Sequence, residues 1–161
     1  MGTVNNDMLL LDKKCVEAFS DADYQVIISA GEMISIEDLG EIPDHISVCR
    51  HVDQIAVLQQ ADVFISHCGM NSVNESLYFG VPLVMLPQTA EQGGVAERVL
   101  QFGAGIKLSK TDALSIRDSV ERILADGSFK RNAAEIADGF KRCSGAAGAA
   151  DKIMQVCALS V

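Results

Sequence analysis

Short apolar runs alternate with longer amphipathic segments along most of the chain. Residues 25–30 (QVIISA) form the first run, and its β-branched side chains predict a buried strand. Similar runs predict strands at residues 46–49, 63–66, 83–86 and 105–108. Because strands of a parallel sheet are buried on both faces, such near-continuous apolar runs favour a parallel sheet covered by helices on both sides.

The segments between these runs have the apolar spacing of helices that bury one face. In the first of them, Leu9, Val16 and Phe19 fall on one side. The predicted helices cover residues 8–20, 55–60, 72–79, 95–102, 114–125, 129–143 and 147–157. Gly80 and Gly103 follow two of them and are expected to end them in a left-handed conformation.

This order of elements predicts one Rossmann-like α/β domain, a doubly wound parallel sheet spanning residues 1–161. A helix comes first in the sequence, whereas such domains normally open with a central strand. We therefore expect a slot at the centre of the sheet with unpaired edges on both sides. Self-association, or a rearranged first segment, is the expected consequence.

Composition narrows the possible partners. The chain has 13 Lys and Arg against 22 Asp and Glu, a net charge of −9. This excess disfavours nucleic acid and anionic membrane surfaces as partners, because both attract basic patches. Aromatic residues make up 5% and Trp is absent, so the core is expected to be aliphatic.

The cysteines and the hydropathy pattern indicate a cytoplasmic protein. The five cysteines are an odd number and include no C-x-x-C pair, which favours free thiols over disulfides or a zinc site. The first residues have no signal-peptide pattern, and no apolar stretch approaches the roughly 18 residues of a membrane span.

The strongest chemical signal lies in residues 63–75 (VFISHCGMNSVNE). A predicted strand runs into a glycine-containing turn and then a helix, and this geometry directs backbone N–H groups and the positive helix end toward one point. A phosphate or diphosphate is the natural ligand, with His67 as a further donor. The alternative is purely structural: Ser72 and Glu75 have the spacing of a capping box, and on spacing alone this interpretation is favoured.

The wider context reverses that preference. The block at residues 67–75 is preceded by residues 51–54 (HVDQ) and followed by residues 80–82 (GVP) and 87–92 (PQTAEQ). In order and spacing these segments resemble the C-terminal signature of UDP-dependent glycosyltransferases of the two-domain GT-B type. The resemblance is closest to the bacterial macrolide glycosyltransferases, covers nearly the whole chain, and implies the donor-binding half of a GT-B fold.

The resemblance implies which residues hold the uridine. The backbone of Val52 and the side chain of Gln54 would meet the uracil and ribose, and His51 would offer a flat face to the base. Glu75 would accept hydrogen bonds from the ribose hydroxyls, which suits a carboxylate because one group can accept from both.

It also implies residues for the diphosphate and the sugar. The diphosphate would be held by the side chain of His67, by the backbone of Gly69 and Met70, and by Asn71 and Ser72. Thr3 would reach it from a first turn at residues 2–3. Glu91 and Gln92 would bind the sugar hydroxyls.

Three features depart from the family pattern. Asp53 stands where the family has proline, and it is expected to cap the following helix although its charge opposes a dianionic ligand. Gly93 and Gly94 replace better helix formers, and each glycine lowers helix stability by up to about 1 kcal/mol. A looser sugar-binding turn is therefore expected. The strand before residues 2–3 is missing.

Two weaker candidates have simpler explanations. Residues 21–23 (DAD) form the D-x-D pattern that marks metal sites in the other major glycosyltransferase fold, but here they lie between a helix and a strand and are not expected to bind metal. His45 is expected to be an exposed loop residue.

The implied reaction is an inverting transfer of a hexose, of glucose type, from a UDP-sugar to a hydroxyl of a small-molecule acceptor. No metal or other cofactor is expected, since the helix near Ser72 and His67 would neutralise the departing diphosphate. The family's catalytic base is a histidine of the acceptor domain, which is absent here, so no catalytic residue is assigned and the chain is expected to be inactive alone. The alternatives are the donor-binding subunit of a split two-chain transferase and a non-catalytic nucleotide-binding α/β module.

Overall fold

The computed structural model describes the backbone of residues 2–158 and the side chains of residues 9–158. Every predicted strand is present, with ends shifted by at most a residue. The strands are β1 (Val26–Ser29), β2 (Ile46–Cys49), β3 (Phe64–Ser66), β4 (Leu83–Met85) and β5 (Gly105–Lys107).

Every predicted helix is present as well. The helices are α1 (Gly2–Phe19), α2 (Gln54–Leu58), α3 (Met70–Tyr78), α4 (Ala90–Gln101), α5 (Ala113–Ala125), α6 (Gly127–Arg142) and α7 (Gly145–Ala158). The sequence analysis missed one short 3-10 helix, η1 (Ile36–Leu39). Gly80 and Gly103 have φ of 67° and 64°, which confirms the left-handed conformations expected after α3 and α4.

Every helix begins earlier than predicted, and α1 and α4 do so by a full turn or more. The expected turn at residues 2–3 is wrong, because these residues belong to the first turn of α1. The helix predicted to start at residue 95 starts at Ala90, since Thr89 caps it there. The helix therefore runs through Gly93 and Gly94, and the loose turn expected at this point is instead helical.

The strands form two separate parallel ladders, one of β1 and β2 and one in the order β3-β4-β5. Ile28 pairs with Val48 in the first, and Val84 pairs with both Ile65 and Ile106 in the second. No ladder joins β1 to β3 within the part of the chain that the structure describes. The interruption expected at the centre of the sheet is therefore observed.

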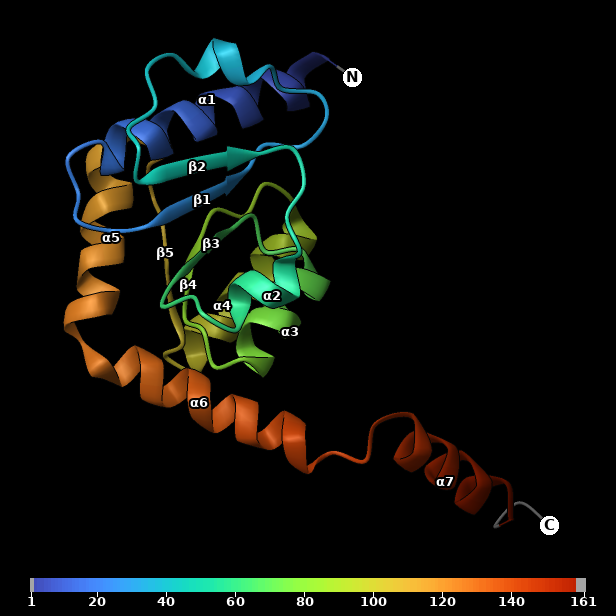
Figure 1. Cartoon of the computed structure of the whole chain (residues 1–161). Helices are drawn as coiled ribbons and strands as arrows, with labels where there is room; N and C mark the ends of the chain where they lie inside the picture. The colour runs from blue at the N-terminus through green and yellow to red at the C-terminus, as the bar shows by residue number, and fades with distance from the viewer. Residues whose placement is uncertain (1, 159–161) are drawn as a thin grey trace.

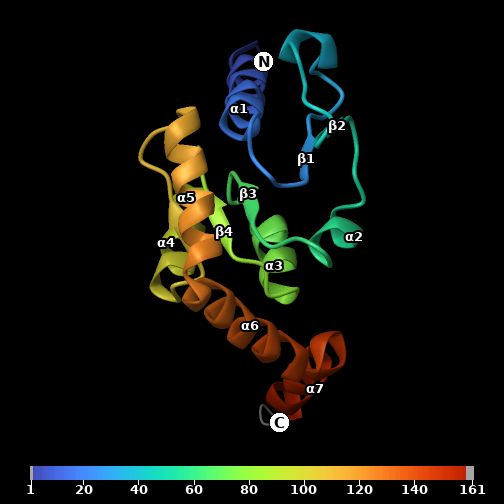
Figure 2. The same cartoon turned by 60° about the vertical axis from the view of Figure 1, so that its left-hand side comes forward.

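Helices cover both faces of the strands, as the apolar runs predicted. In Figure 2, α1 and α5 lie on one side and α3 lies on the other. The pleat of β4 divides its side chains accordingly: Val84 joins the core beneath α1 and α5, while Leu83 and Met85 join the core beneath α3 and α4. This is the layered arrangement of a doubly wound α/β domain.

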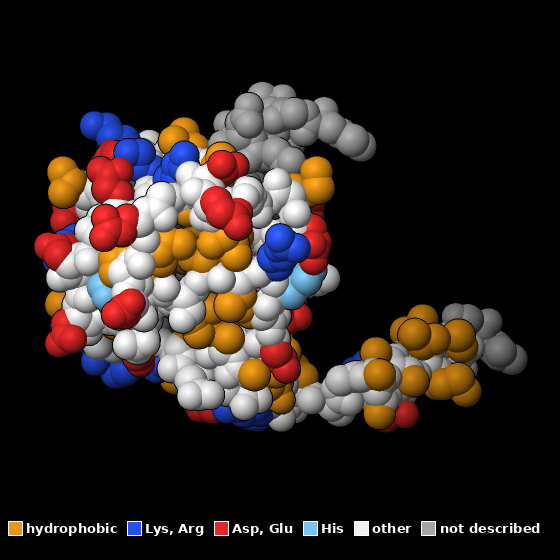
Figure 3. Space-filling view, turned by 45° about the horizontal axis from the view of Figure 1, so that its top comes forward, with side chains coloured by type: hydrophobic (Ala, Val, Ile, Leu, Met, Phe, Trp, Pro, Cys, Tyr) orange, Lys and Arg blue, Asp and Glu red, His pale blue; other side chains and the backbone are white. Residues whose placement is uncertain are grey.

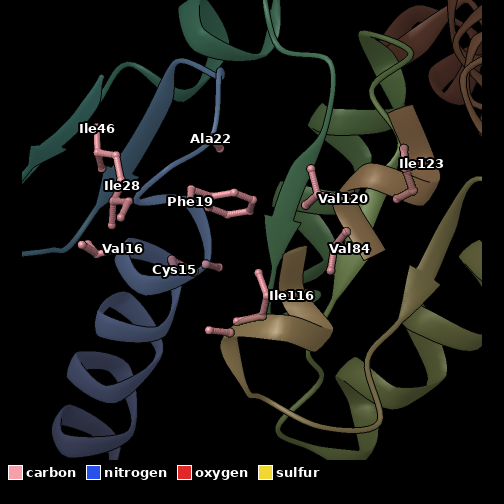
Figure 4. Packing of buried hydrophobic residues seen from close by; sticks show 12 residues of the cluster. Cys15, Val16, Phe19, Ala22, Ile28, Ile46, Val84, Ile116, Val120 and Ile123 are labelled. Atoms are coloured by element: carbon pink, nitrogen blue, oxygen red, sulfur yellow. The ribbon is translucent and has the colours of Figure 1, made fainter. Parts of the chain in front are cut away.

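One apolar core spans both ladders. It contains Ile28 of β1 and Val84 of β4 together with residues of α1 and α5. Figure 4 shows Phe19, at the end of α1, between the side chains of β1 and β2 on one side and those of β4 and α5 on the other. The ladders are thus joined by side-chain packing although they share no backbone hydrogen bonds.

The last helix projects from the body of the molecule (Figure 1). Only Cys143 and Ser144 separate α6 from α7. None of the described residues of α7 is buried, and Ile153 and Met154 are 63% and 69% exposed. Figure 3 shows apolar side chains gathered on the projecting helix.

Several other expectations can be compared with the fold. All five cysteines are free thiols. Asp21 of the D-x-D pattern pairs with Arg117, and the described residues contain no group of acidic, histidine or cysteine side chains that could hold a metal ion. His45 was wrongly expected to be exposed: it is half-buried, and its Nε2 lies 2.8 Å from the Phe19 carbonyl oxygen at the end of α1. No helix in the described part of the chain is long and apolar enough to cross a membrane.

Candidate functional site

A sharp turn connects β3 to α3 at the carboxyl edge of the second ladder. Cys68, in the middle of this turn, is fully buried and has φ of 68°, a left-handed conformation that is uncommon for a residue other than glycine. Its N–H donates to the Ser66 hydroxyl over 3.1 Å. This bond holds the turn, so that α3 starts immediately beyond the end of β3.

The first turn of α3 is not closed by a side chain. Its N-cap is Gly69, which has no side-chain cap, and no acidic residue lies in the first turn. The capping box of Ser72 and Glu75, which was the purely structural alternative, is not formed, because the helix begins at Met70 and Ser72 already lies inside it. The N–H groups at this helix end are therefore available to an anion, as are those of other uncapped helix starts.

A hollow of about 300 Å³ lies at the same place, lined by Gly69, Met70, Asn71, Ser72 and Glu91. The first four belong to the start of α3, and Glu91 comes from the first turn of α4. Both helices follow parallel strands at their carboxyl ends, where ligands of doubly wound sheets bind. Five of the residues expected at the site are thus brought together.

His67 lies over Gly69. A Cβ on Gly69 would stand only 3.1 Å from Nε2 of His67, so the missing side chain is what allows the imidazole to approach the helix start. The His67 side chain is exposed, in contrast to the buried Cys68 beside it.

Gln54 and Glu75 form a polar cluster on the side of α3. Nε2 of Gln54 donates to Oε2 of Glu75 over 2.5 Å and lies 3.4 Å from the Ser72 hydroxyl. Asp53 caps α2 as expected, accepting from the Ala56 N–H over 3.1 Å, and thereby places Gln54 at the first helical position. The two residues expected to hold ribose are therefore already joined.

The start of α4 is a capping box of Thr89 and Gln92. The side-chain carbonyl of Gln92 accepts from the N–H groups of Gln88 and Thr89 over 2.8 and 3.2 Å. These bonds hold Gln92 against its own backbone, whereas the neighbouring Glu91 is exposed toward the hollow.

His51 and Val52 are not among the residues that line the hollow at the start of α3. His51 lies in the loop after β2, where its Nε2 is 2.8 Å from a carboxylate oxygen of Glu32. Val52 is half-buried beside it. The side chain of Thr3 lies outside the described residues. Sequence reasoning missed Glu32, which carries no signal beyond its position shortly after a strand.

A second hollow, of about 290 Å³, adjoins the polar cluster and was also missed. Glu75 belongs to its lining together with Ile55, Asn74, Tyr78, Phe79 and Phe140. The ring of Tyr78 lies near those of Phe79 and Phe140, with centroids 5.1 and 6.3 Å away. No sequence pattern indicated this grouping, because Phe140 comes from α6, far along the chain.

Buried thiols near the site are not suited to nucleophilic chemistry. Burial raises the pKa of Cys68 to about 11, so the thiolate is scarce at neutral pH. The site instead consists of helix N–H groups, an imidazole, amides and carboxylates, which bind anions and hydroxyl groups.

Known proteins with the same sequence pattern are glycosyltransferases. The family described as erythromycin biosynthesis protein CIII-like, C-terminal domain, matches residues 13–148. The chain is 35% identical to YojK, an uncharacterized UDP-glucosyltransferase of Bacillus subtilis, over 96% of its own length and 39% of that protein. It is 37% identical to the NDP-glycosyltransferase YjiC of the same organism, over 95% of this chain and 40% of the relative.

A solved structure agrees with these relatives. The calicheamicin glycosyltransferase CalG4 superimposes with a TM-score of 0.83 at 28% identity, over 90% of this chain and 38% of that one. The present chain thus spans about two fifths of the proteins that it matches. It belongs to the erythromycin biosynthesis protein CIII-like C-terminal domain family, the C-terminal domain of GT-B glycosyltransferases.

Proposed function

We propose that this domain binds the UDP-sugar donor of a glycosyltransferase. The observation that carries the proposal is the hollow at the start of α3, where uncapped N–H groups lie beside His67 and Glu91. A diphosphate fits such a helix start, since the N–H groups and the helix dipole favour negative charge there. They act locally, against the net charge of −9 of the whole chain.

The polar cluster suits the ribose of the same ligand. Two vicinal hydroxyls can donate to the carboxylate of Glu75, replacing the Gln54 amide that donates to it without ligand. Gln54 is then released toward the base, next to the backbone of Val52 and the ring of His51. The sugar would lie at Glu91, at the opposite end of the hollow.

The chemistry proposed for the assembled enzyme is an inverting transfer of a glucose-type hexose to an acceptor hydroxyl. The hydroxyl oxygen attacks the anomeric carbon as the bond to the UDP oxygen breaks. The start of α3 and His67 would stabilise the negative charge on the departing diphosphate without a metal ion. We assign no base to this chain and propose that the proton is taken up by a residue outside it.

Calorimetric titration with UDP tests the binding. We expect measurable binding by this chain, weakened about tenfold or more in Glu75→Gln, because hydrogen bonds to a charged group contribute about 1.5–3 kcal/mol. Asp118→Asn on the exposed side of α5 is the matched control and should bind like the unaltered chain. No binding at millimolar UDP, or equal binding by Glu75→Gln, would contradict the proposed site.

A transfer assay tests the assignment of the base. With UDP-glucose and a panel of phenolic acceptors, we expect no glucoside from this chain alone. Steady turnover by the purified chain would show that it holds a base of its own and would overturn that part of the proposal.

A further inference from the structure

The loops that follow β1 and β2 are joined by backbone hydrogen bonds beyond the ends of both strands. The N–H of Ala30 donates to the Cys49 carbonyl over 2.9 Å, and the N–H of Gly31 donates to the Arg50 carbonyl over 3.1 Å. The two strands run in the same direction, with their carboxyl ends on one side (Figure 1). Their pairing therefore continues as far as Arg50, the residue before His51.

Gly31 turns the first of these loops. Its φ of 75° is left-handed, a conformation that favours glycine because glycine has no Cβ. Directly after this turn the carboxylate of Glu32 reaches the imidazole of His51, with Oε1 at 2.8 Å from Nε2. Because a carboxylate oxygen accepts, Nε2 carries a proton and donates this hydrogen bond. The paired loops thus bring together two side chains that are far apart in the sequence.

Other carboxylates close to His51 in the sequence already have partners. Asp53 accepts from a backbone N–H of α2 and caps that helix. Glu37, in η1 of the same connection between β1 and β2, accepts a hydrogen bond from the Ser35 hydroxyl. Among the described residues, Glu32 is the one whose carboxylate is paired with this imidazole.

The bond to Glu32 holds a ring that packing does not hold. The side chain of His51 is 76% exposed. An exposed side chain loses rotational freedom when a ligand stacks on it, and a ring that is already held loses less. The side chain of Glu32 is itself 59% exposed, so the pair contributes little to the stability of the folded chain. Its effect is therefore expected on ligand binding.

We propose that Glu32 is a positioning residue for the nucleobase of the donor, because its bond to Nε2 holds the ring of His51. The N–H of an imidazole lies in the plane of the ring, so this bond leaves the flat faces open to the base. This role rests on the proposed function, in which the base lies beside Val52 and His51. It adds to that site a residue of the loop after β1, where no site residue was expected.

Titrations of UDP and of uridine, followed by NMR, test this role. Uridine has the base and the ribose but no phosphate, so the charge of Glu32 has no anionic group to repel. The variants are Glu32→Ala, Glu32→Gln and Glu37→Ala. Glu32→Gln keeps an oxygen that can accept from Nε2 of His51. Glu37→Ala removes the same charge from the same connection and leaves the pair of Glu32 and His51 intact.

We expect Glu32→Ala to weaken uridine binding about threefold to tenfold, the range for ordering one side chain on binding. Glu32→Gln should recover most of this loss, and Glu37→Ala should bind uridine like the unaltered chain. UDP should distinguish Glu32→Ala from Glu37→Ala in the same direction. Ribose 5-phosphate lacks the base and should not distinguish these two variants, because both lose one negative charge.

A second measurement, made without nucleotide, reports on the ring itself. NMR relaxation of the ring carbons of His51 should show an ordered ring in the unaltered chain and in Glu32→Gln, and a more mobile one in Glu32→Ala. Thermal unfolding should occur at the same temperature in all variants within about 2 °C, because the pair is exposed. A role of Glu32 in stability alone would change the unfolding temperature and leave the ring motion unchanged.

Equal binding of UDP by Glu32→Ala and Glu37→Ala, or unchanged motion of the His51 ring in Glu32→Ala, would overturn the assignment of Glu32. Failure of UDP to bind the unaltered chain would overturn the proposed function, and the role of Glu32 with it. Binding of UDP that is indifferent to Glu32→Ala would overturn the role of Glu32 alone. The two failures are therefore distinguishable.

Discussion

Asp12 is a carboxylate inside the domain. Its side chain lies on α1 among buried residues, and its Oδ2 is buried without a hydrogen-bond partner. Burial raises its pKa from 3.8 to about 6, because the charged form loses its hydration. The same burial, with the nearby Asp12 charge as a smaller contribution, raises the pKa of Cys15 to about 12.

This pKa makes stability depend on pH in a defined direction. Between pH 3.8 and about 6 the folded state holds a proton that the unfolded chain has lost, so stability falls as pH rises and is constant above that range. Asp12→Asn removes the charge, and we expect it to stabilise the domain at pH 7.5 by up to about 3 kcal/mol but to have little effect near pH 4.

Urea denaturation at the two pH values measures this difference. The exposed Asp118→Asn serves as control and should change neither midpoint. If Asp12→Asn stabilised the domain equally at pH 4 and pH 7.5, the raised pKa of Asp12 would not be the cause.

Gly69 links a single missing side chain to ligand binding. Its φ of −58° and ψ of 132° are accessible to alanine, so Gly69→Ala should cost no more than about 1 kcal/mol of stability at the cap. The added Cβ would meet Nε2 of His67 at 3.1 Å and displace the ring. We expect UDP affinity to fall several-fold, measured by calorimetry.

Gly139→Ala is the control for that measurement, because a Cβ there meets nothing within 4 Å. Unchanged affinity in Gly69→Ala would show that the position of His67 does not matter for the nucleotide.

Among the elements, the start of α3 shows most clearly which hydrogen bonds a sequence pattern could not predict. The serine and glutamate at positions 72 and 75 have the spacing of a cap, yet a glycine caps α3 and Glu75 bonds to Gln54 of α2. A capping pattern is local, whereas the partner of Glu75 is 21 residues away and is chosen by packing. By contrast, the glycine stops after α3 and α4 depend only on local backbone conformation and were predicted correctly.

Gly80 at the end of α3 and Gly139 within α6 are expected to respond in opposite ways to replacement by alanine. Gly80 has φ of 67°, and a Cβ on it would lie 3.4 Å from the backbone of Ala134 in α6. We expect Gly80→Ala to lower stability by about 1–2 kcal/mol through left-handed strain. Gly139→Ala, within α6 and in open space, should instead add up to about 1 kcal/mol.

Thermal or urea unfolding of the two variants measures both values. Loss of stability in both would indicate that α6 needs a glycine for a reason other than helix propensity.

At the scale of the molecule, α7 is an appendage that contributes little to the folded body. Because none of its described residues is buried, a chain ending at Ser144 should unfold at the same temperature within about 2 °C. Removal of the exposed Ile153 and Met154 should also reduce aggregation at high concentration. Calorimetry and light scattering check the two expectations.

A shorter chain ending at Ala125 is the control. It also lacks α6, whose Ala133 and Ala137 are buried, and should be markedly destabilised. A large loss of stability on removing α7 alone would mean that this helix packs against the body in solution.

The sequence by itself determined the layered α/β class, the order of strands and helices and the family, because apolar periodicity, left-handed glycines and the spacing of residues 51–92 are local properties of a chain. It also indicated the interruption of the sheet, since the order of elements begins with a helix. Only the tertiary structure decided that Glu91 meets the start of α3, that Gln54 holds Glu75, and that the two ladders share one core around Phe19. These contacts join residues distant in sequence, so they depend on how helices pack over the strands.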